Sequence, residues 1–123
     1  MIRYEKADDI NQRMVTIANK LGMKHDLSRV VCVRSHGSSA RRTLARCHAL
    51  PRIMQLALGT RAVYVVEVIA EKFDKLSGEE QDKTIIHELM HIPKSFGGGF
   101  RNHSQYVTRE KVERMYRKFL SNV

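Results

Sequence analysis

Residues 87–91 read His-Glu-Leu-Met-His, and this short pattern constrains the chain more than any other stretch. Positions i and i+4 lie on the same face of an α-helix, so His87 and His91 can reach one metal ion together. Glu88 then lies beside the ion without being a ligand. Two imidazoles with an adjacent carboxylate are typical of zinc peptidases, in which the Glu takes a proton from water. The motif therefore predicts two zinc ligands, His87 and His91, and a general base, Glu88.

The residues on either side of the motif predict that it lies in a buried helix. Ser77 and Glu80 match a capping box at the start of this helix, and Pro93 ends it shortly after the second His. The second half of the helix is largely apolar, which predicts burial. Two imidazoles and a carboxylate are costly to bury without a partner, and a metal ion supplies one. The alternative is an accidental match on a surface helix with two ordinary histidines.

Length and composition favour a small cytosolic protein. The chain has 123 residues, of which 42% are hydrophobic, so we expect one domain over residues 1–123 with one modest core. No apolar run is long enough to span a bilayer, and the charged N-terminus does not resemble a secretory signal. We therefore expect a cytoplasmic location and no membrane partner. Cys32 and Cys47 are expected to be core thiols rather than a disulfide or part of a second metal site.

The balance of charge is strongly basic. There are 22 Lys and Arg residues against 13 Asp and Glu residues, which gives a formal net charge of +9. Such a charge favours polyanionic partners, so nucleic acid is a candidate partner. The alternative is a solvated basic surface without a specific partner. No zinc finger, aromatic RNA-binding platform or helix-turn-helix pattern supports the nucleic-acid interpretation.

The pattern of apolar residues predicts an α+β fold. Helical periodicity marks the first helix, and β-branched residues mark the clearest strand, at 62–69. The short connections between strands predict a mostly antiparallel sheet of three or four strands, with a hairpin turn at Gly59 and Thr60. The expected elements are a helix at 5–21, extended segments at 30–33, 43–50, 53–58 and 62–69, the motif helix, a glycine-rich loop at 95–102 and a helix at 105–120.

Two histidines leave a zinc site incomplete, because catalytic zinc usually has three protein ligands and a water. His103 is the favoured third ligand, since the three glycines before it let the chain turn back toward the motif helix. Glu110 and Glu113 are the alternatives. The helical pattern of the last segment directs Glu110 away from the apolar face and puts Glu113 on its flank.

Several stretches between residues 40 and 103 carry a family resemblance. They are Arg46-Cys47-His48-Ala49-Leu50-Pro51-Arg52, Tyr64-Val65-Val66-Glu67-Val68, Phe73-Asp74-Lys75-Leu76-Ser77, the motif from Ile85 to Pro93, and Phe96-Gly97-Gly98-Gly99-Phe100-Arg101-Asn102-His103. Together they resemble the HExxH metallopeptidase family of phages and archaea, and more distantly the SprT-like zinc proteases. The resemblance implies a small zincin with zinc ligands His87, His91 and His103, the base Glu88 and peptidase activity. It does not imply a DNA-repair role, because no separate DNA-binding module is expected here.

The motif and the resemblance together predict a zinc-dependent metalloendopeptidase that acts on a protein or peptide substrate. Tyr106, Arg101 and His48 are candidates to bind the substrate or stabilise the oxyanion. Strand 62–69 is a candidate to pair with an extended substrate if it lies at a sheet edge, and otherwise belongs to the core sheet. A zinc hydrolase for another amide or ester bond is a further possibility.

The alternative function is a basic nucleic-acid-associated protein with a structural or vestigial zinc site. Glu88 argues for the enzyme, because a structural site needs no base and closes its fourth position with Cys or His.

Overall fold

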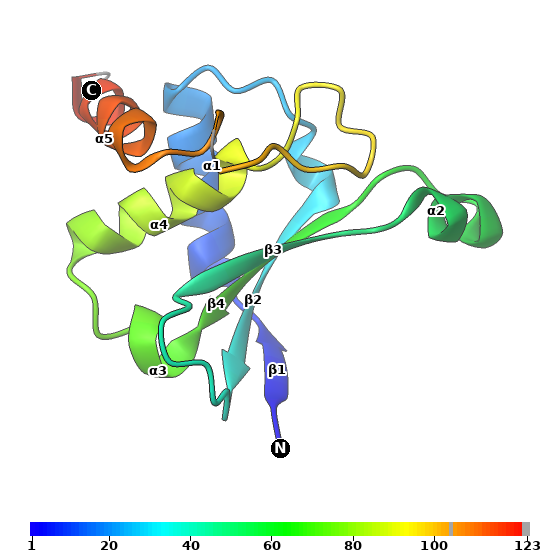
Figure 1. Ribbon diagram of the computed structural model, residues 1–123, viewed down its shortest axis with the longest axis horizontal. Coiled ribbons are helices and arrows are strands. Elements are labelled where there is room, and N and C mark those ends of the chain that lie inside the picture. Colours follow the sequence, from blue (N-terminus) through cyan, green and yellow to red (C-terminus); the bar gives the residue numbers. More distant parts are fainter. Residues whose placement is uncertain (104, 122–123) are drawn as a thin grey trace.

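The computed structural model describes residues 1–103 and 105–121, and it shows helices packed against a four-stranded sheet (Figure 1). The expected α+β fold with a C-terminal helix is therefore confirmed. The elements in chain order are β1 (Arg3–Lys6), α1 (Asp8–Lys20), the 3₁₀ helix η1 (Leu27–Arg29), β2 (Val30–His36), β3 (Ala45–Ala49), α2 (Arg52–Leu58), β4 (Tyr64–Ile69), α3 (Ala70–Phe73), α4 (Gly78–Met90) and α5 (Arg109–Ser121).

The strands lie in the order β1-β2-β4-β3, with β3 at one edge. The pairs β1–β2 and β3–β4 are antiparallel, as predicted for most of the sheet, whereas the central pair β2–β4 is parallel. A parallel pair needs a long connection, and here residues 37–63, with β3 and α2, provide it. Strand β4 is thus central, and the edge strand on its side of the sheet is β3.

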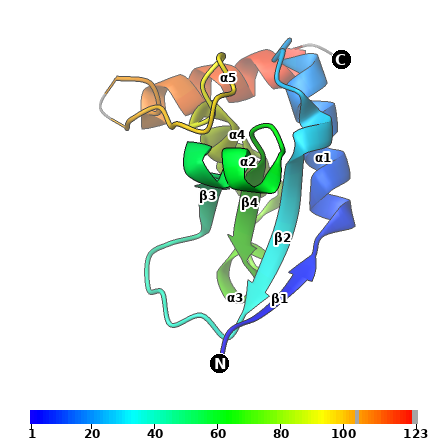
Figure 2. The same cartoon turned by 90° about the vertical axis from the view of Figure 1, so that its right-hand side faces the viewer.

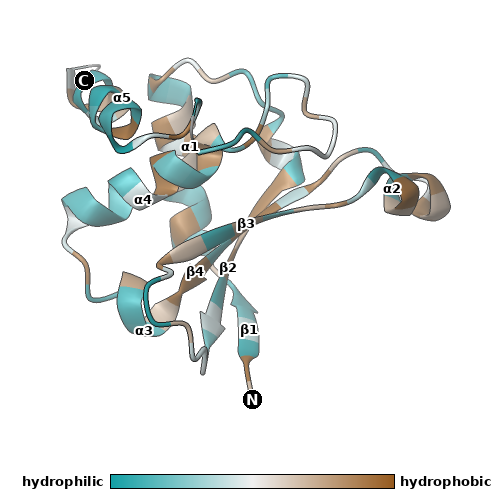
Figure 3. Ribbon diagram, in the orientation of Figure 1, coloured by the Kyte–Doolittle hydropathy of each residue, from teal (hydrophilic) through white to brown (hydrophobic). Residues whose placement is uncertain are grey.

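Helix α2 occupies the segment expected to be a strand at 53–58, so that prediction was wrong. Pro51 stands at its N-cap, where no backbone N–H is needed, and Gly59 closes it in the left-handed conformation with φ of 62°. Gly59 therefore ends a helix instead of forming the expected hairpin turn. The helix projects from the rest of the molecule (Figure 1), and Figure 2 shows it from the projecting end. Most of its residues are apolar (Figure 3), and Leu56 is 84% exposed.

The first helix matches its predicted apolar face, although it begins at Asp8 rather than at residue 5. The residues before it form β1, a strand that was not predicted and whose four side chains are all exposed. The residues of the predicted apolar face are all buried: Ile10, Met14, Ile17 and Ala18 in α1, and Leu21 directly after it.

Helix α4 lies between the sheet and α5, and its second half is buried as predicted. Ile85, Ile86 and Leu89 are completely covered. Its N-terminus is capped by the Ser77 hydroxyl, which accepts a hydrogen bond of 3.2 Å from the backbone N–H of Glu80. This packing holds the motif rigidly against the sheet. Among the described residues, no helix combines the length and the apolar character needed to cross a membrane.

Both cysteines are free, as predicted. Cys32 on β2 and Cys47 on β3 are each in register with Val66 of the strand between them. Two strand spacings separate their Cα atoms by about 9–10 Å, which is beyond the reach of a disulfide. Their thiols are therefore part of the packing of the sheet, and burial raises the pKa of each to about 12.

Candidate metal centre

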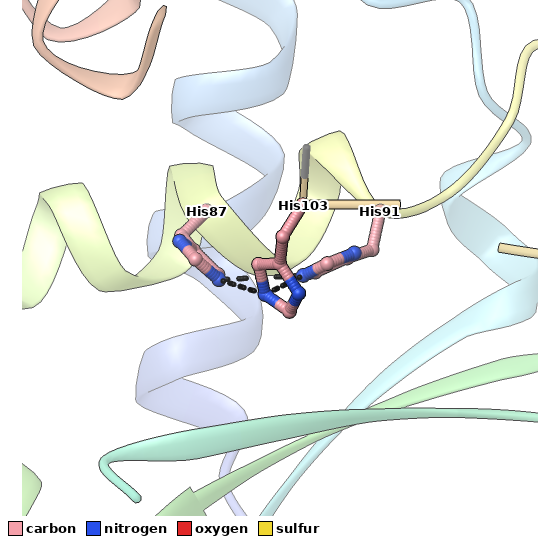
Figure 4. A group of neighbouring side chains, drawn as sticks. All are labelled: His87, His91 and His103. Atoms are coloured by element: carbon pink, nitrogen blue, oxygen red, sulfur yellow. Dashed lines mark hydrogen bonds between the residues drawn. The ribbon is translucent and has the colours of Figure 1, made fainter. Parts of the chain in front are cut away.

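Three imidazole rings converge in front of α4 (Figure 4). His87 and His91 come from successive turns of the helix, and His103 returns to them from the loop that follows. The Nε2 atom of His91 lies 3.3 Å from Nε2 of His87 and 3.0 Å from Nε2 of His103, and the third distance is 3.3 Å. The three residues thus form a group that could hold a metal ion.

The spacing of these nitrogens fits a tetrahedral metal ion. Zinc–nitrogen distances of about 2.0–2.1 Å place the ligand nitrogens of a tetrahedral site about 3.3–3.4 Å apart. The observed separations of 3.0–3.3 Å are close to that value. Hydrogen bonds alone do not explain a triangle in which every corner is an Nε2 atom, because each edge would need its own proton. The donor set is therefore suited to zinc.

The tautomer of His91 is set by the backbone of the returning loop. Its Nδ1 atom lies 2.8 Å from the carbonyl oxygen of Arg101, to which it donates, and the N–H of Arg101 donates to the His91 carbonyl at 2.8 Å. With its proton on Nδ1, the neutral ring has its lone pair on Nε2, which points at the other two rings. Metal-binding histidines are commonly oriented by a carbonyl acceptor of this kind.

The glycine-rich loop reaches the metal centre because it is anchored on the sheet. The backbone N–H of Gly98 donates to the Tyr64 hydroxyl at 2.9 Å, and that hydroxyl donates to the carbonyl of Gly99 at 2.8 Å. Gly98 has a φ of 107°, which side-chain-bearing residues rarely adopt. A Cβ there would lie 3.0 Å from the carbonyl oxygen of Leu50 and 2.7 Å from the side-chain nitrogen Nε2 of Gln55. Glycine is therefore required at this position.

Glu88 is buried beside the three rings, with only 6% of its surface exposed. Its Oε2 atom lies 3.9 Å from Nε2 of His87, so the carboxylate is adjacent to the ligand group without belonging to it. Burial raises the pKa of Glu88 to about 7. A carboxylate of raised pKa is a stronger proton acceptor than an exposed one.

The same environment favours the neutral form of the two motif histidines, His87 and His91. Burial, together with the neighbouring rings of His91 and His103, lowers the pKa of His87 to about 4. Burial also lowers the pKa of His91, although its bond to the Arg101 carbonyl opposes this. Neutral imidazoles are the form that binds metal, so these rings need not lose a proton near pH 7.

A cavity of about 520 Å³ lies over the three histidines and Glu88. Ala45 and Cys47 of β3 form one side of it, and Phe100 and Arg101 of the loop form another. Of these four wall residues, only Arg101 was predicted to be near the site. Strand alternation predicts that Ala45 and Cys47 share a face, but which face meets α4 depends on the register of β3.

The other predicted substrate or oxyanion residues lie outside the lining of this cavity. The ring of Tyr106 stacks under the guanidinium of Arg101 at 5.3 Å and lines a different cavity. The ring of His48 lies 2.8 Å from the buried carboxylate of Glu67. Among the three candidates, only Arg101 is thus placed beside the metal centre.

The alternative third ligands are not part of the converging group in the described structure. Glu110 points into solvent with a side chain that is 84% exposed, and it pairs with Arg114 at 3.6 Å. Glu113 forms an ion pair of 3.0 Å with Lys83 of α4. Of the three candidates, His103 is the one whose ring meets those of the motif.

Comparison with known proteins identifies the family of the chain. Residues 2–120 match the family described as "Putative phage metallopeptidase". No curated protein and no solved structure matches. The match does not extend to the SprT-like proteases, for which the similarity stays a prediction. A metallopeptidase family implies a metal ion, and the three converging histidines are a group able to hold it. Because the match covers nearly the whole length, the chain belongs to this family of phage metallopeptidases.

Proposed function

We propose that the protein is a zinc-dependent endopeptidase whose zinc ligands are His87, His91 and His103. The observation that carries the proposal is the convergence of three Nε2 atoms, at 3.0–3.3 Å, beside a buried carboxylate. A zinc ion bound there would supply a Lewis acid that activates water and polarises the scissile carbonyl.

Glu88 acts as the general base in this proposal. Its carboxylate faces the cavity beside His87, where it takes a proton from the attacking water and passes it to the leaving amine. The Arg101 carbonyl holds His91 in the tautomer that leaves Nε2 available. Arg101 also belongs to the lining of the cavity, and we propose that it contributes to substrate binding there.

The substrate in this proposal is an extended peptide paired with the free edge of β3. Strand 62–69 was the earlier candidate for this pairing, but β4 is enclosed between β2 and β3 and has no free edge. Strand β3 is an edge strand whose Ala45 and Cys47 line the cavity. Backbone pairing along such an edge presents an internal peptide bond, which is why we propose an endopeptidase.

The nucleic-acid alternative is not favoured. The family match points to a peptidase, and a buried Glu88 beside the ligand group has no purpose in a structural zinc site. A steep salt dependence of DNA binding would still be informative, because it would indicate substrates that are themselves bound to DNA.

Zinc content tests the ligand set. Purified wild-type protein, His103→Ala and Glu110→Ala would be compared by plasma mass spectrometry. We expect about one zinc per chain in the wild type and in Glu110→Ala, and loss of zinc in His103→Ala, as a three-ligand site requires. Glu110→Ala is the matched control because that side chain is exposed. Zinc-free wild-type protein that stays so after zinc is added back would refute the proposal.

Cleavage of unfolded protein substrates tests the chemistry. Wild-type protein with zinc is expected to produce internal cuts, and Glu88→Gln is expected to keep its zinc but lose the cleavage. Equal cleavage by both proteins would show that Glu88 is not the base.

A further inference from the structure

A second cavity, of about 590 Å³, lies where the segment after α1, the end of α4 and the start of α5 come together. It shares only Arg101 with the cavity over the histidines. A volume in this range is typical of pockets that enclose a whole small molecule. Its apolar wall is formed by Leu21, Met23, Leu89, Met90, Ile92 and Met115.

The lining of this cavity also includes four cationic residues: Lys24, Lys94, Arg101 and Lys111. No Asp or Glu is among the lining residues. Within residues 1–103 and 105–121, none of the four makes an ion pair with a carboxylate within 4.0 Å. Lys83 of α4 differs in this respect, because it forms ion pairs with Glu79 and Glu113.

Two of these cations are held in position by Tyr106. The guanidinium of Arg101 lies 5.3 Å from the centre of its ring, and the ammonium of Lys111 lies 5.8 Å from it. Lys111 also donates a hydrogen bond to the carbonyl of Gln105. Neutral groups therefore hold Arg101 and Lys111 in place. No carboxylate of the described residues neutralises their charge.

We propose that this cavity binds a small amphipathic anion, namely a free acyl carboxylate whose chain lies on the methionine-rich wall and whose head group meets the cations. An apolar wall alone would accept any apolar ligand, and the net charge of +9 alone would attract anions to many surfaces. Only the combination of wall and cations selects a ligand with both properties. Methionine side chains suit such a ligand because they adapt to a flexible chain.

The distribution of methionines allows a sharp test. Three of the six, Met23, Met90 and Met115, line the cavity, whereas Met1, Met14 and Met54 do not. With methionine methyl groups labelled with carbon-13, octanoate added to the purified protein should shift the first three signals and leave the other three unchanged. Met54, on the exposed apolar helix α2, reports on nonspecific binding to apolar surface.

Two control ligands test separately the contribution of the apolar chain and that of the negative charge. Octylammonium has the same chain with the opposite charge, and acetate has the same charge without the chain. We expect each to bind at least about tenfold more weakly than octanoate, since each loses one class of contact. Equal shifts with octylammonium, shifts that include Met54, or no shift at millimolar octanoate would overturn the proposal.

Charge variants complete the experiment. Replacing both Lys24 and Lys94 with Gln should weaken octanoate binding by about tenfold, because two exposed ion pairs contribute roughly that much together. Arg117→Gln is the control, since this exposed cation of α5 is not in the cavity lining. An equal effect of Arg117→Gln would mean that the net charge, and not this cavity, attracts the ligand.

Discussion

Arg34 connects three separate parts of the molecule through one guanidinium group. It extends from β2 and lies 2.6 and 2.8 Å from the two carboxylate oxygens of Asp9 on α1, and 3.3 Å from Asp74 after α3. The arginine side chain is only 17% exposed. The hydrogen bond from Arg34 is the largest cause that lowers the pKa of Asp9, to about 2.

The stability contributed by Asp9 should therefore depend on pH. Its folded pKa of about 2 is below the ordinary value of 3.8, so the contribution is present above about pH 4 and is lost as the pH falls toward 2. Because the Asp9 carboxylate is largely exposed, we expect Asp9→Asn to destabilise by only about 1 kcal/mol at pH 7. Urea denaturation of both proteins across this range measures the effect. The neighbouring Asp8→Asn is the control, and a difference that did not change with pH would contradict the prediction.

Gly98 is the residue on which the position of His103 depends most directly. Gly98→Ala would force a strained φ and a contact with the Leu50 carbonyl oxygen, so the loop must shift. We expect zinc affinity to fall by about tenfold or more, because strain of this kind amounts to roughly 1–3 kcal/mol. Competition with a zinc chelator measures it. Gly97→Ala is the matched control, since a Cβ at residue 97 meets nothing within 4 Å.

At the scale of elements, the second half of α4 and most of α2 are apolar, and the two have opposite surroundings. Helix α4 buries its apolar residues between the sheet and α5, whereas none of the residues of α2 is buried. Hydrophobicity alone therefore does not distinguish a core helix from a projecting one.

A matched pair of substitutions should separate these two environments. Leu89→Ala removes a completely buried side chain of α4 and should destabilise by about 2–5 kcal/mol. Leu56→Ala removes the same atoms from a side chain that is 84% exposed, and should change stability by at most about 0.5 kcal/mol. Chemical denaturation measures both values. A large effect at Leu56 would show that α2 packs against something in solution.

The elements that could be predicted are those in which the apolar residues recur with helical spacing and are the ones buried in the structure. The apolar faces of α1 and α4 have helical spacing, and both helices are present. Strand β1 could not be predicted, because all of its side chains are exposed and its pairing with β2 is made by the backbone. Helix α2 could not be recognised because its apolar run is short, and short apolar runs do not distinguish strand from helix.

At the scale of the whole molecule, a metal ion would join two segments that are otherwise held by few contacts. His87 lies in α4 and His91 caps its C-terminus, whereas His103 belongs to a loop anchored through Tyr64 and Arg101. A ligand that binds only the folded chain stabilises it in proportion to the logarithm of its concentration.

Removal of the metal should therefore lower thermal stability. At a zinc concentration one hundred times the Kd, the stabilisation is about 2.7 kcal/mol, which corresponds to a rise in Tm of roughly 10 °C for a chain of this size. Differential scanning fluorimetry with a chelator, followed by zinc in excess, measures it. His103→Ala should show little of this shift. A wild-type Tm that did not respond to either addition would contradict the prediction.

The site was more predictable than the sheet around it. The motif places two rings on one helix face by local geometry, and the glycines before His103 indicate that the chain turns back. The cavity wall depends on long-range pairing instead. Ala45 and Cys47 line the cavity because β3 pairs with β4 in one register, and no local pattern specifies that register. Whether the three rings bind zinc stays a prediction until metal content is measured.

The carbonyl that orients His91 belongs to the main chain of Arg101. The backbone of this residue therefore has one role and its side chain can have another. A substitution at residue 101 replaces a side chain of a residue that lines both cavities, yet it keeps the peptide group whose carbonyl accepts from His91. A change of residue type at position 101 would therefore alter the lining of both cavities while the carbonyl that orients His91 is retained. Residue 101 is a place where drift in specificity does not endanger the metal centre.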